Sequence, residues 1–555
     1  MRPVHSSLLV ATVVTCLASA LYVRAEGPTF LLGWIAFVPW LAALDRVTSL
    51  RRAFLAGLLM CEGFTLAVFF WFALAIQDYT GASLPVAWLV LLAIAPLLQP
   101  QFIFFALART AARRAGAAGW IVALAGAGVY VGSEWLLPKL FADTFGHPQY
   151  ASPQLRQAAD LVGAPGLTFV LVVANERVLA ILRHRSRDAV PAAAGLAALV
   201  VALLLYGELR LRQFDVPAPG EENLVAGIVQ ADISHYSRLA TQMGTYDAVR
   251  LILDTHFALS SQALAQGPLD LLVWPETVYP TTFGTPKSED GAAFDREIAD
   301  FVARSGVPLV FGAYDGKGGD EFNAAVLLEP EADGHPRFDT YRKALLFPLI
   351  ERTPALFDSA TVRGWFPWLG TWKAGGGAQV LDLHRADGRV VRLAPLICYD
   401  ALEPSLAIAA VRKGAEVIVT LSNDSWFAEG GVPHLILVVS AFRSIETRRP
   451  QVRATNTGVS AVISPTGEFS DVIGVHEKSI LVRGVHPRRG ADTLMLAWGD
   501  WFGGFALGLG SAMLMVAFIR SPRTHPAMSP RRAPPVKQSH HDRKYAMRNM
   551  GTPPK

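Results

Sequence analysis

The stretch LAPLICYDALEP, residues 393–404, contains an apolar run that stops at a single thiol, Cys398. A tyrosine and two acids break the apolar pattern directly afterwards, and the stretch ends at Pro404. An apolar run of this kind predicts a buried strand, and a proline favours the first turn of a helix. A thiol at the turn between them lies close to the amide groups that open the helix, which favour a thiolate. The stretch therefore predicts a strand, a turn that carries Cys398, and a helix.

The roles open to Cys398 are limited by the positions of the other cysteines. Only Cys16 and Cys61 accompany it, and both lie in apolar segments that we expect inside a membrane. Neither is therefore in reach for a disulfide bond. No His or Cys stands near Cys398 at the spacing of metal ligands, and the chain has no C-x-x-C motif. Two interpretations remain open, namely a buried inert thiol and a nucleophile.

The segments around residues 393–404 alternate between short β-rich runs and helix-like stretches. This alternation predicts a layered α/β domain. The expected strands are residues 224–229, 271–274, 309–314, 324–328, 390–397, 417–421 and 459–463. The expected helices include residues 245–265, 292–304, 404–413 and 435–448.

The rest of the chain is far more apolar than this domain. Hydrophobic residues make up 52% of the chain and charged residues 17%, against about 25% charged residues in soluble proteins. Most of the apolar segments approach the roughly 20 residues that a helix needs to cross a bilayer. The sequence therefore predicts a membrane protein with one large aqueous domain. The eight expected spans are residues 7–23, 29–44, 54–76, 84–108, 117–136, 161–182, 190–206 and 501–519.

Basic residues between these spans predict the orientation. The loops after the second, fourth and sixth spans carry three arginines each: Arg46, Arg51 and Arg52; Arg109, Arg113 and Arg114; Arg183, Arg185 and Arg187. Positive loops stay in the cytoplasm, so both termini are expected there. The expected units are a seven-helix membrane domain (1–207), an outer domain (208–490), an eighth helix (491–520) and a basic, disordered tail (521–555). The net charge of +4 does not favour a nucleic-acid partner.

Two further charged residues in the outer domain are candidates for a catalytic site with Cys398. Glu276 follows the apolar run LLVW, where partial desolvation would raise the pKa of a carboxylate toward that of a useful base. Lys343 precedes the apolar stretch ALLFPLI, where an ammonium group can stabilise an oxyanion. Each has a simpler interpretation, since Glu276 can be an acid at a helix N-terminus and Lys343 a surface residue. When Glu276 and Lys343 are each considered alone, the simpler interpretation of each residue is favoured.

The three residues together change this balance. Glu276 in WPE, Lys343 in YRK and Cys398 in ICYD resemble, in the same chain order, the Glu–Lys–Cys triad of the nitrilase superfamily. The segments LSNDSWF (421–427) and RSIETRRPQVRATNTGVSAVISPTGE (443–468) resemble later motifs of one branch, the apolipoprotein N-acyltransferases. The order of seven spans, outer domain and eighth span is similar to that branch as well.

This resemblance implies an α-β-β-α sandwich attached to eight transmembrane helices. It implies that Cys398 is the nucleophile, Glu276 the general base and Lys343 the oxyanion stabiliser. Glu351 matches a second glutamate of the family, and Tyr399 matches the residue after the nucleophile. Asp400 stands where the family has glutamate, so the same charge sits on a side chain one methylene shorter. The resemblance implies neither a cofactor nor a metal.

The function implied is acyl transfer at the bacterial inner membrane. Cys398 would take the sn-1 acyl chain of a phospholipid as a thioester, and the α-amino group of a diacylglyceryl-cysteine apolipoprotein would then receive it. The catalytic domain would face the periplasm. Two alternatives are a membrane-tethered amidase for a small substrate, which would need no eight spans, and a non-catalytic lipid-binding scaffold, which would not need all three residue types. The apolar residues around 345–349 and 365–368 either line an acyl entry or pack in the core.

Overall fold

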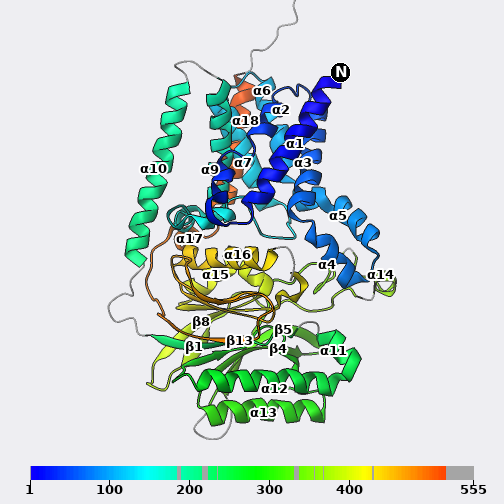
Figure 1. Ribbon diagram of the computed structural model, residues 1–555, viewed down its shortest axis with the longest axis vertical. Helices are drawn as coiled ribbons and strands as arrows, with labels where there is room; N and C mark the ends of the chain where they lie inside the picture. The colour runs from blue at the N-terminus through cyan, green and yellow to red at the C-terminus, as the bar shows by residue number, and fades with distance from the viewer. Residues whose placement is uncertain are drawn as a thin grey trace, which may run out of the picture.

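The computed structural model describes residues 2–183, 189–214, 223–233, 236–330, 337–355, 357–366, 368–427 and 431–520. The basic tail expected over residues 521–555 lies outside the described residues, as do Arg185 and Arg187 of the third arginine loop. Figure 1 shows a bundle of helices at one end of the molecule and a layered domain of strands and helices at the other.

The layered domain contains two sheets packed face to face. The first has the order β13-β1-β2-β4-β5-β6, with β3 paired to β4, and the second has the order β12-β11-β10-β9-β8-β7. Side chains from both sheets form one buried apolar core. The strands of the first sheet are β1 (Leu224–Gln230), β2 (Leu271–Val273), β3 (Tyr279–Thr282), β4 (Leu309–Lys317), β5 (Asp320–Glu329), β6 (Arg337–Arg342) and β13 (Ser479–Val485). Those of the second are β7 (Leu381–His384), β8 (Val390–Ile397), β9 (Val417–Ser422), β10 (Gln451–Thr455), β11 (Ser460–Ile463) and β12 (Phe469–Ile473).

Helices cover the outer face of each sheet. Helices α12 (Thr245–Leu264) and α13 (Glu289–Ser305) lie on the first sheet, and α15 (Pro404–Arg412) and α16 (Val432–Thr447) on the second, next to the bundle (Figure 1). The four layers confirm the expected α-β-β-α sandwich and all the expected strands and helices of this domain. Of the six strands that we did not predict, β3 is the short YPTT, and the other five, among them β10 in QVRAT and β6 in RFDTYR, mix apolar with charged residues, so their pattern gave little signal.

The bundle contains the remaining long helices. Among the residues that the structure describes, four spans are long and apolar enough to cross a membrane, or up to six if each of two bent helix pairs is one span. The expected segments are all helical, but the count of eight spans is not confirmed. The helices are α1 (Arg2–Tyr22), η1 (Gly27–Trp34) with α2 (Val38–Leu44), α3 (Leu50–Val68), α4 (Trp71–Thr80), α5 (Leu84–Leu98), α6 (Gln101–Arg114), α7 (Gly119–Leu136), α9 (Ala159–Arg183), α10 (Ala189–Phe214) and α18 (Phe502–Ile519).

Two of the expected straight spans are bent. The break between α5 and α6 turns the chain by 46° next to Pro96 and Pro100, which remove backbone donors from the helix. The break between α3 and α4 turns it by 75°, so that α4 runs toward the sandwich (Figure 1). As a result α4 contacts the loop of residues 424–427, close to Cys398 in space.

The last helix, α18, packs closely against α7. A Cβ atom on Gly128 would lie 2.6 Å from the carbonyl oxygen of Ala506, and one on Gly510 would lie 2.7 Å from the backbone nitrogen of Val129. Small residues at such a crossing let two helices approach within van der Waals contact of their backbones. These two glycines therefore allow α18 to pack against α7 as part of the helical bundle.

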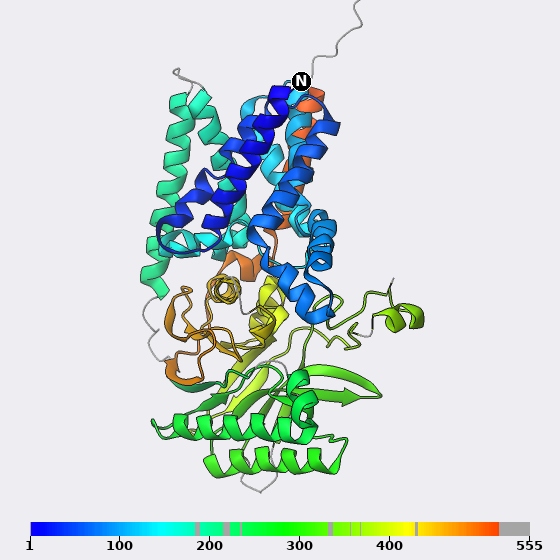
Figure 2. The same ribbon diagram turned by 45° about the vertical axis from the view of Figure 1, so that its right-hand side comes forward.

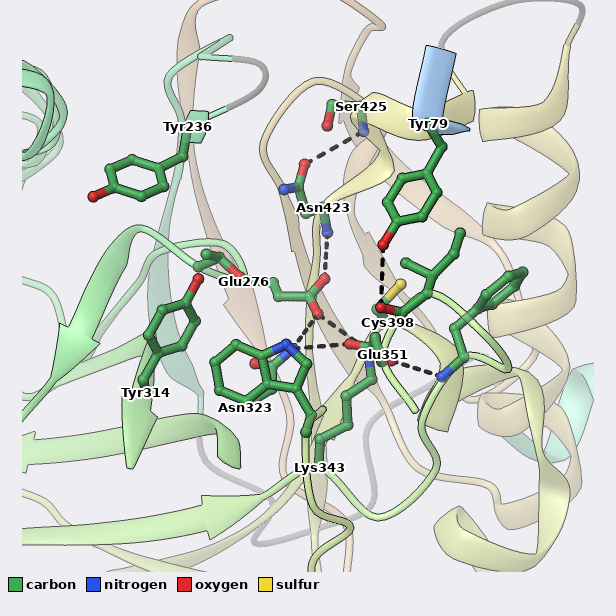
Figure 3. Close-up of a pocket in the computed structure, with 14 residues that line it drawn as sticks. Tyr79, Tyr236, Glu276, Tyr314, Asn323, Lys343, Glu351, Cys398, Asn423 and Ser425 are labelled. Atoms are coloured by element: carbon green, nitrogen blue, oxygen red, sulfur yellow. Dashed lines mark hydrogen bonds and ion pairs between the residues drawn. The ribbon is translucent and has the colours of Figure 1, made fainter. Parts of the chain in front are cut away.

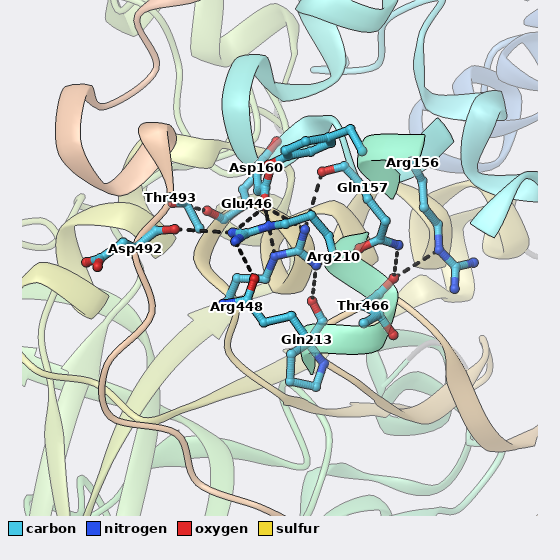
Figure 4. Close-up of polar contacts among 12 residues, drawn as sticks. Arg156, Gln157, Asp160, Arg210, Gln213, Glu446, Arg448, Thr466, Asp492 and Thr493 are labelled. Carbon is cyan, nitrogen blue, oxygen red and sulfur yellow. Dashed lines mark hydrogen bonds and ion pairs between the residues drawn. The ribbon is translucent and has the colours of Figure 1, made fainter. Parts of the chain in front are cut away.

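A buried polar network joins the bundle to the sandwich (Figure 4). Arg448, which follows α16, donates to Asp160 Oδ2 at 2.6 Å and to Gln157 Oε1 at 2.6 Å. Arg210 of α10 donates to the same Asp160 oxygen at 2.6 Å. Arg448 and Asp160 are both fully buried. The network therefore ties together the start of α9, the end of α10 and the sandwich.

Replacing Arg448 by leucine tests whether this network holds the two parts together. Removal of one partner of a buried ion pair costs about 3 kcal/mol, so we expect R448L to lower the thermal midpoint in detergent by about 5 °C. The matched control is R483L, which breaks the exposed Arg483–Asp471 pair and should shift the midpoint by no more than about 1 °C. Equal shifts in the two variants would contradict the role given to Arg448.

Candidate active site

Glu276 lies at the end of β2, where the chain turns away from the sheet. Its side chain is 6% exposed. Asn323 Nδ2 and Lys343 Nζ donate to Oε1 at 2.8 and 3.1 Å, and the backbone N–H of Asn423 donates to Oε2 at 2.8 Å. Gly312 of β4 makes the turn possible, since a Cβ there would lie 2.6 Å from the Cα of Glu276. The carboxylate is thus buried but held by three donors.

Lys343 follows β6 and is 2% exposed. Its ammonium group also donates to Glu351 Oε1 at 2.8 Å, so two carboxylates share it. Burial alone would lower the pKa of Lys343, but Glu276 and Glu351 outweigh burial and hold it well above the usual value. Glu351 is fixed in turn, because its Oε2 accepts the backbone N–H of Phe347 at 2.7 Å. The lysine is therefore a fixed positive charge.

Burial has the opposite effect on the carboxylate beside it. Burial raises the pKa of Glu276, and the neighbouring charge of Glu351 raises it further. Lys343 and Asn323 lower it, but the two raising effects together are larger, so the net pKa is raised. A carboxylate with a raised pKa is a stronger base than an exposed one. Glu276 therefore combines a fixed position with the ability to accept a proton.

Cys398 ends β8 and begins the short 3-10 helix η3 (Cys398–Leu402). Its φ is +47°, in the left-handed region that side chains other than glycine rarely adopt. Thr277 and Leu349, which flank the turns of Glu276 and Glu351, also have positive φ, at 58° and 68°. Strained backbone of this kind persists where the surrounding structure holds it, and it gathers at functional sites. Here it occurs in the turns that carry Glu276, Glu351 and Cys398.

The thiol of Cys398 is neutral in this environment. Burial raises its pKa, the carboxylate of Glu276 adds to the increase, and Lys343 acts in the opposite direction. A partly buried thiol of raised pKa needs a base to form the reactive thiolate. Glu276 and Glu351 both share a cavity with it, and Glu276, whose pKa is raised, is the candidate base.

Asp400 supports the turn from inside the domain and is fully buried. Its carboxylate accepts from the hydroxyl of Tyr341 at 2.8 Å and from the backbone N–H groups of Leu345 and Ile397 at 2.8 and 3.1 Å. Burial raises the pKa of Asp400 to about 6. The short side chain thus joins the Cys398 turn to the segment that follows Lys343.

Tyr399 points the other way, toward the bundle. Its hydroxyl donates to the carbonyl oxygen of Leu140 at 2.9 Å, in the loop after α7. Its ring meets that of Phe347 edge-on, with centroids 5.3 Å apart. The residue after the thiol is therefore a contact between the sandwich and the membrane helices.

One cavity of about 260 Å³ brings the candidate residues together (Figure 3). Glu276, Lys343, Glu351 and Cys398 line it, whereas Tyr399 and Asp400 support it from outside. The other labelled residues around it are Tyr79, Tyr236, Tyr314, Asn323, Asn423 and Ser425. Tyr79 comes from α4, and its hydroxyl donates to the backbone carbonyls of Ile350 and Trp368 at 3.2 and 2.9 Å.

A second, narrow cavity of about 50 Å³ also reaches Cys398. Its walls are almost entirely apolar and come from the bent α3–α4 pair, from α16 and from Phe347. Leu349, Trp365 and Phe366 of the apolar stretches noted in the sequence are exposed rather than packed in a core, at 39, 71 and 44%. The helix α14 (Ala360–Trp365) projects away from the sandwich (Figure 2).

Sequence reasoning missed several residues of the site, among them Asn323, Asn423 and Tyr79. Asn323 interrupts the apolar strand FNAAVLL, and an amide inside such a strand is a usable signal of a buried polar role. Asn423 acts through its backbone N–H, which leaves no trace in residue type. Tyr79 lies just beyond the segment expected to end at residue 76, and only the bend before α4 brings it to the cavity.

Together these groups are suited to acyl transfer through a thioester. A buried base can take the thiol proton, a fixed ammonium group can stabilise an oxyanion, and the strained turn presents the sulfur to the cavity. The apolar cavity beside the sulfur can hold the first carbons of an acyl chain.

Comparisons with known proteins cover both parts of the chain. A family model for carbon-nitrogen hydrolases matches residues 226–491, and one for the N-terminal domain of apolipoprotein N-acyltransferases matches residues 18–176. An apolipoprotein N-acyltransferase of Geobacter metallireducens is 27% identical over 89% of this chain and 92% of its own. One from Chlorobaculum tepidum is 26% identical over 88% of this chain and 92% of its own. The crystal structure of Saccharomyces cerevisiae Nit3, of the nitrilase superfamily, matches 48% of this chain and 91% of its own at 18% identity, with a TM-score of 0.35.

Replacing Asp400 by asparagine tests its role as a support of the Cys398 turn. The amide keeps one acceptor and turns an NH₂ group toward donors, a loss of about 2 kcal/mol. At pH 8, above its pKa of about 6, we expect D400N to lower both the thermal midpoint and the rate of Cys398 acylation, the latter about tenfold. The control is D382N, on a half-exposed aspartate of β7. An unchanged rate and midpoint in D400N would contradict the role.

Proposed function

We propose that this chain, like the apolipoprotein N-acyltransferases that it resembles over most of its length, transfers a fatty acyl group from a phospholipid through Cys398 to the amino terminus of apolipoproteins. The observation that carries the proposal is the shared cavity of Cys398, Glu276 and Lys343, beside an apolar cavity bounded by membrane helices. A water-filled site for a small soluble substrate would have no use for the second cavity. The amidase alternative is therefore not favoured.

In the first half-reaction Cys398 attacks the sn-1 ester carbonyl of the phospholipid. Glu276 takes the thiol proton as the carbon–sulfur bond forms, and Lys343 Nζ with the backbone N–H of Tyr399 stabilises the oxyanion. When the carbon–oxygen bond breaks, Glu276 returns the proton to the leaving glycerol oxygen. The products are a lysophospholipid and an acyl thioester on Cys398.

In the second half-reaction the α-amino group of a diacylglyceryl-cysteine attacks the thioester. Glu276 takes a proton from the attacking nitrogen, and the thiolate leaves and is protonated again. An amide replaces the thioester, which is the more activated of the two, so the reaction needs no ATP. Glu351 keeps Lys343 in place in both halves, and Asp400 keeps the turn of Cys398.

The chain is a multi-pass bacterial membrane protein, and we place it in the inner membrane with the sandwich on the periplasmic side. The supporting feature is the charge at the far end of the bundle. There Asp45 pairs with Arg109 and Arg113 at 2.7 and 2.9 Å and also with Arg183. Positive loops mark the cytoplasmic side, so both termini lie in the cytoplasm. The proposed units are residues 1–207, 208–490, 491–520 and the tail 521–555.

Replacing Cys398 by alanine tests the nucleophile. The alanine variant has no sulfur to carry the acyl group, so C398A incubated with phospholipid should show no covalent adduct by mass spectrometry. The matched control is C16A, which removes a buried thiol of α1 and should keep the adduct. An adduct of undiminished yield in C398A would remove Cys398 from the reaction.

The pH dependence of thioester formation tests Glu276 as the base. The base must be ionised, so the rate falls as the pH drops through its raised pKa. The charge of Glu351 helps to raise the pKa of Glu276, so E351Q should lower that pKa. The acidic limb of the pH–rate profile should then move to lower pH by up to about one unit. The control E297Q, on the exposed face of α13, should leave the limb in place. A limb that stays in place or moves to higher pH in E351Q excludes this coupling.

A further inference from the structure

A third cavity lies where the bundle meets the sandwich, and Tyr399 is part of its wall. This interface cavity has a volume of about 460 Å³ and is lined by the end of α7, residues 137–139 and 142–144, the start of α9, η3, and Asp500 two residues before α18. Cys398 is not in its wall, but Asp143, Tyr399 and Leu402 border both this cavity and the apolar one. The mechanism above makes no use of it.

Carboxylates dominate the charge of the interface cavity. Glu134, Asp143, Glu403 and Asp500 line it, against Lys139 and Arg443. Lys139 pairs with Glu134 at 3.2 Å, and Arg443 pairs with Glu446 at 2.8 Å. Within the described ranges, Glu403 and Asp500 form no salt bridge. The wall therefore holds a surplus of carboxylates, and two of them, Glu403 and Asp500, are free to pair with an ammonium group of a ligand.

Burial makes this surplus costly without a ligand. Burial raises the pKa of both Glu403 and Asp500, although the guanidinium of Arg443 lowers it. Asp500 Oδ1 accepts no hydrogen bond from any residue that the structure describes. Unpaired carboxylates in such a place favour an ammonium group that can both neutralise them and donate to them.

His147 supplies an unused donor in the same wall. It is 2% exposed, and its ring lies edge-on against Phe442 with centroids 4.8 Å apart. The backbone N–H of Thr144 donates to Nδ1 at 2.9 Å, so Nδ1 is the acceptor and the ring proton of neutral His147 is on Nε2. Nε2 has no partner among the residues described. A buried N–H that is left unpaired calls for an acceptor such as a phosphate oxygen.

Arg443 supplies a second unused hydrogen-bond donor in the same wall. Its Nη1 donates to the carbonyl oxygen of Leu402 at 2.8 Å and its Nη2 to Glu446, but Nε has no partner in the part of the chain that the structure describes. The side chain is 1% exposed. The interface cavity thus contains two buried, unused donors as well as unpaired carboxylates. A ligand that suits it carries an oxyanion and a cation.

The position of the cavity narrows the ligand class. Trp135 and Leu136, in its wall at the end of the membrane helix α7, are 48 and 60% exposed. A tryptophan at the end of a span is typical of the membrane interface, where phospholipid headgroups lie. A ligand that enters here arrives from the headgroup layer of the bilayer.

We propose that the interface cavity binds the headgroup of an aminophospholipid, with its primary ammonium group at Glu403 and Asp500 and its phosphate at His147 and Arg443. The headgroup belongs either to the acyl donor, in which case the site rests on the proposed function, or to a second lipid that does not react. In both cases the lipid touches Tyr399, next to the nucleophile.

The test measures binding of dihexanoylphosphatidylethanolamine and dihexanoylphosphatidylglycerol to the full-length C398A protein in detergent by calorimetry. C398A cannot form a thioester, so the result does not depend on the nucleophile assignment. We expect the ethanolamine lipid to bind at least about tenfold more tightly. E403Q and D500N, each added to C398A, should weaken its binding about tenfold while the thermal midpoint stays that of C398A. The control D254N, on an exposed carboxylate of α12, should change nothing.

Equal affinity for the two lipids, or undiminished binding in both E403Q and D500N, would overturn the proposal. Displacement of the lipid by an equal concentration of the dipeptide Cys-Ser amide would overturn it as well, because the site would then hold a peptide amino terminus. The source of the headgroup is determined from the kinetics of Cys398 acylation, measured in the protein that retains the Cys398 thiol. If E403Q and D500N raise KM for a phosphatidylethanolamine donor alone, the donor occupies the site. If they slow acylation equally for both donors, a second lipid does.

Discussion

The ammonium group of Lys343, shared between the carboxylates of Glu276 and Glu351, is the interaction on which the candidate site depends. An unpaired charge in this position would be strongly destabilising, and two carboxylates without the lysine would repel each other. The arrangement is stable only when all three are present, so each fixes the position of the others. Asn323 donates to both carboxylates and completes the group. The thiol of Cys398 then meets a base and a cation whose positions are already set.

The sandwich is held against the helical bundle by contacts on both sides of the site. Arg448 and Asp160 hold the two parts together on one side, and the bent helix α4 brings Tyr79 against the Lys343–Glu351 loop on the other. Tyr399 extends this contact from the nucleophile itself to the loop after α7. The turn that carries the thiol is thus supported by the domain through Asp400 and by the membrane helices through Tyr399. The residue that follows the nucleophile is therefore itself a contact with the helical bundle.

Much of this could be predicted from the sequence, because the informative residues are simple in type. Apolar runs that end in Cys398 and Glu276 mark strand ends, and strand ends meet at one edge of a sandwich. The bends at α3–α4 and α5–α6 could not be predicted, since hydropathy measures how apolar a segment is but not its direction. Backbone donors such as the N–H of Asn423, and the strained φ of Cys398, depend on tertiary packing and leave no pattern in the residue types. Asp400 looked like a departure from the family, and in the structure its short side chain reaches three donors.

The most direct test of the central claim follows the acyl group itself. The protein is incubated with a phospholipid whose sn-1 and sn-2 chains differ in mass, and the peptide that contains Cys398 is analysed before and after a diacylglyceryl-cysteine peptide is added. The account predicts that the sn-1 chain appears on Cys398 as a thioester and then moves to the α-amino group of the added peptide. An acyl group that bypasses Cys398, or that stays on it when the amine is present, would contradict the account.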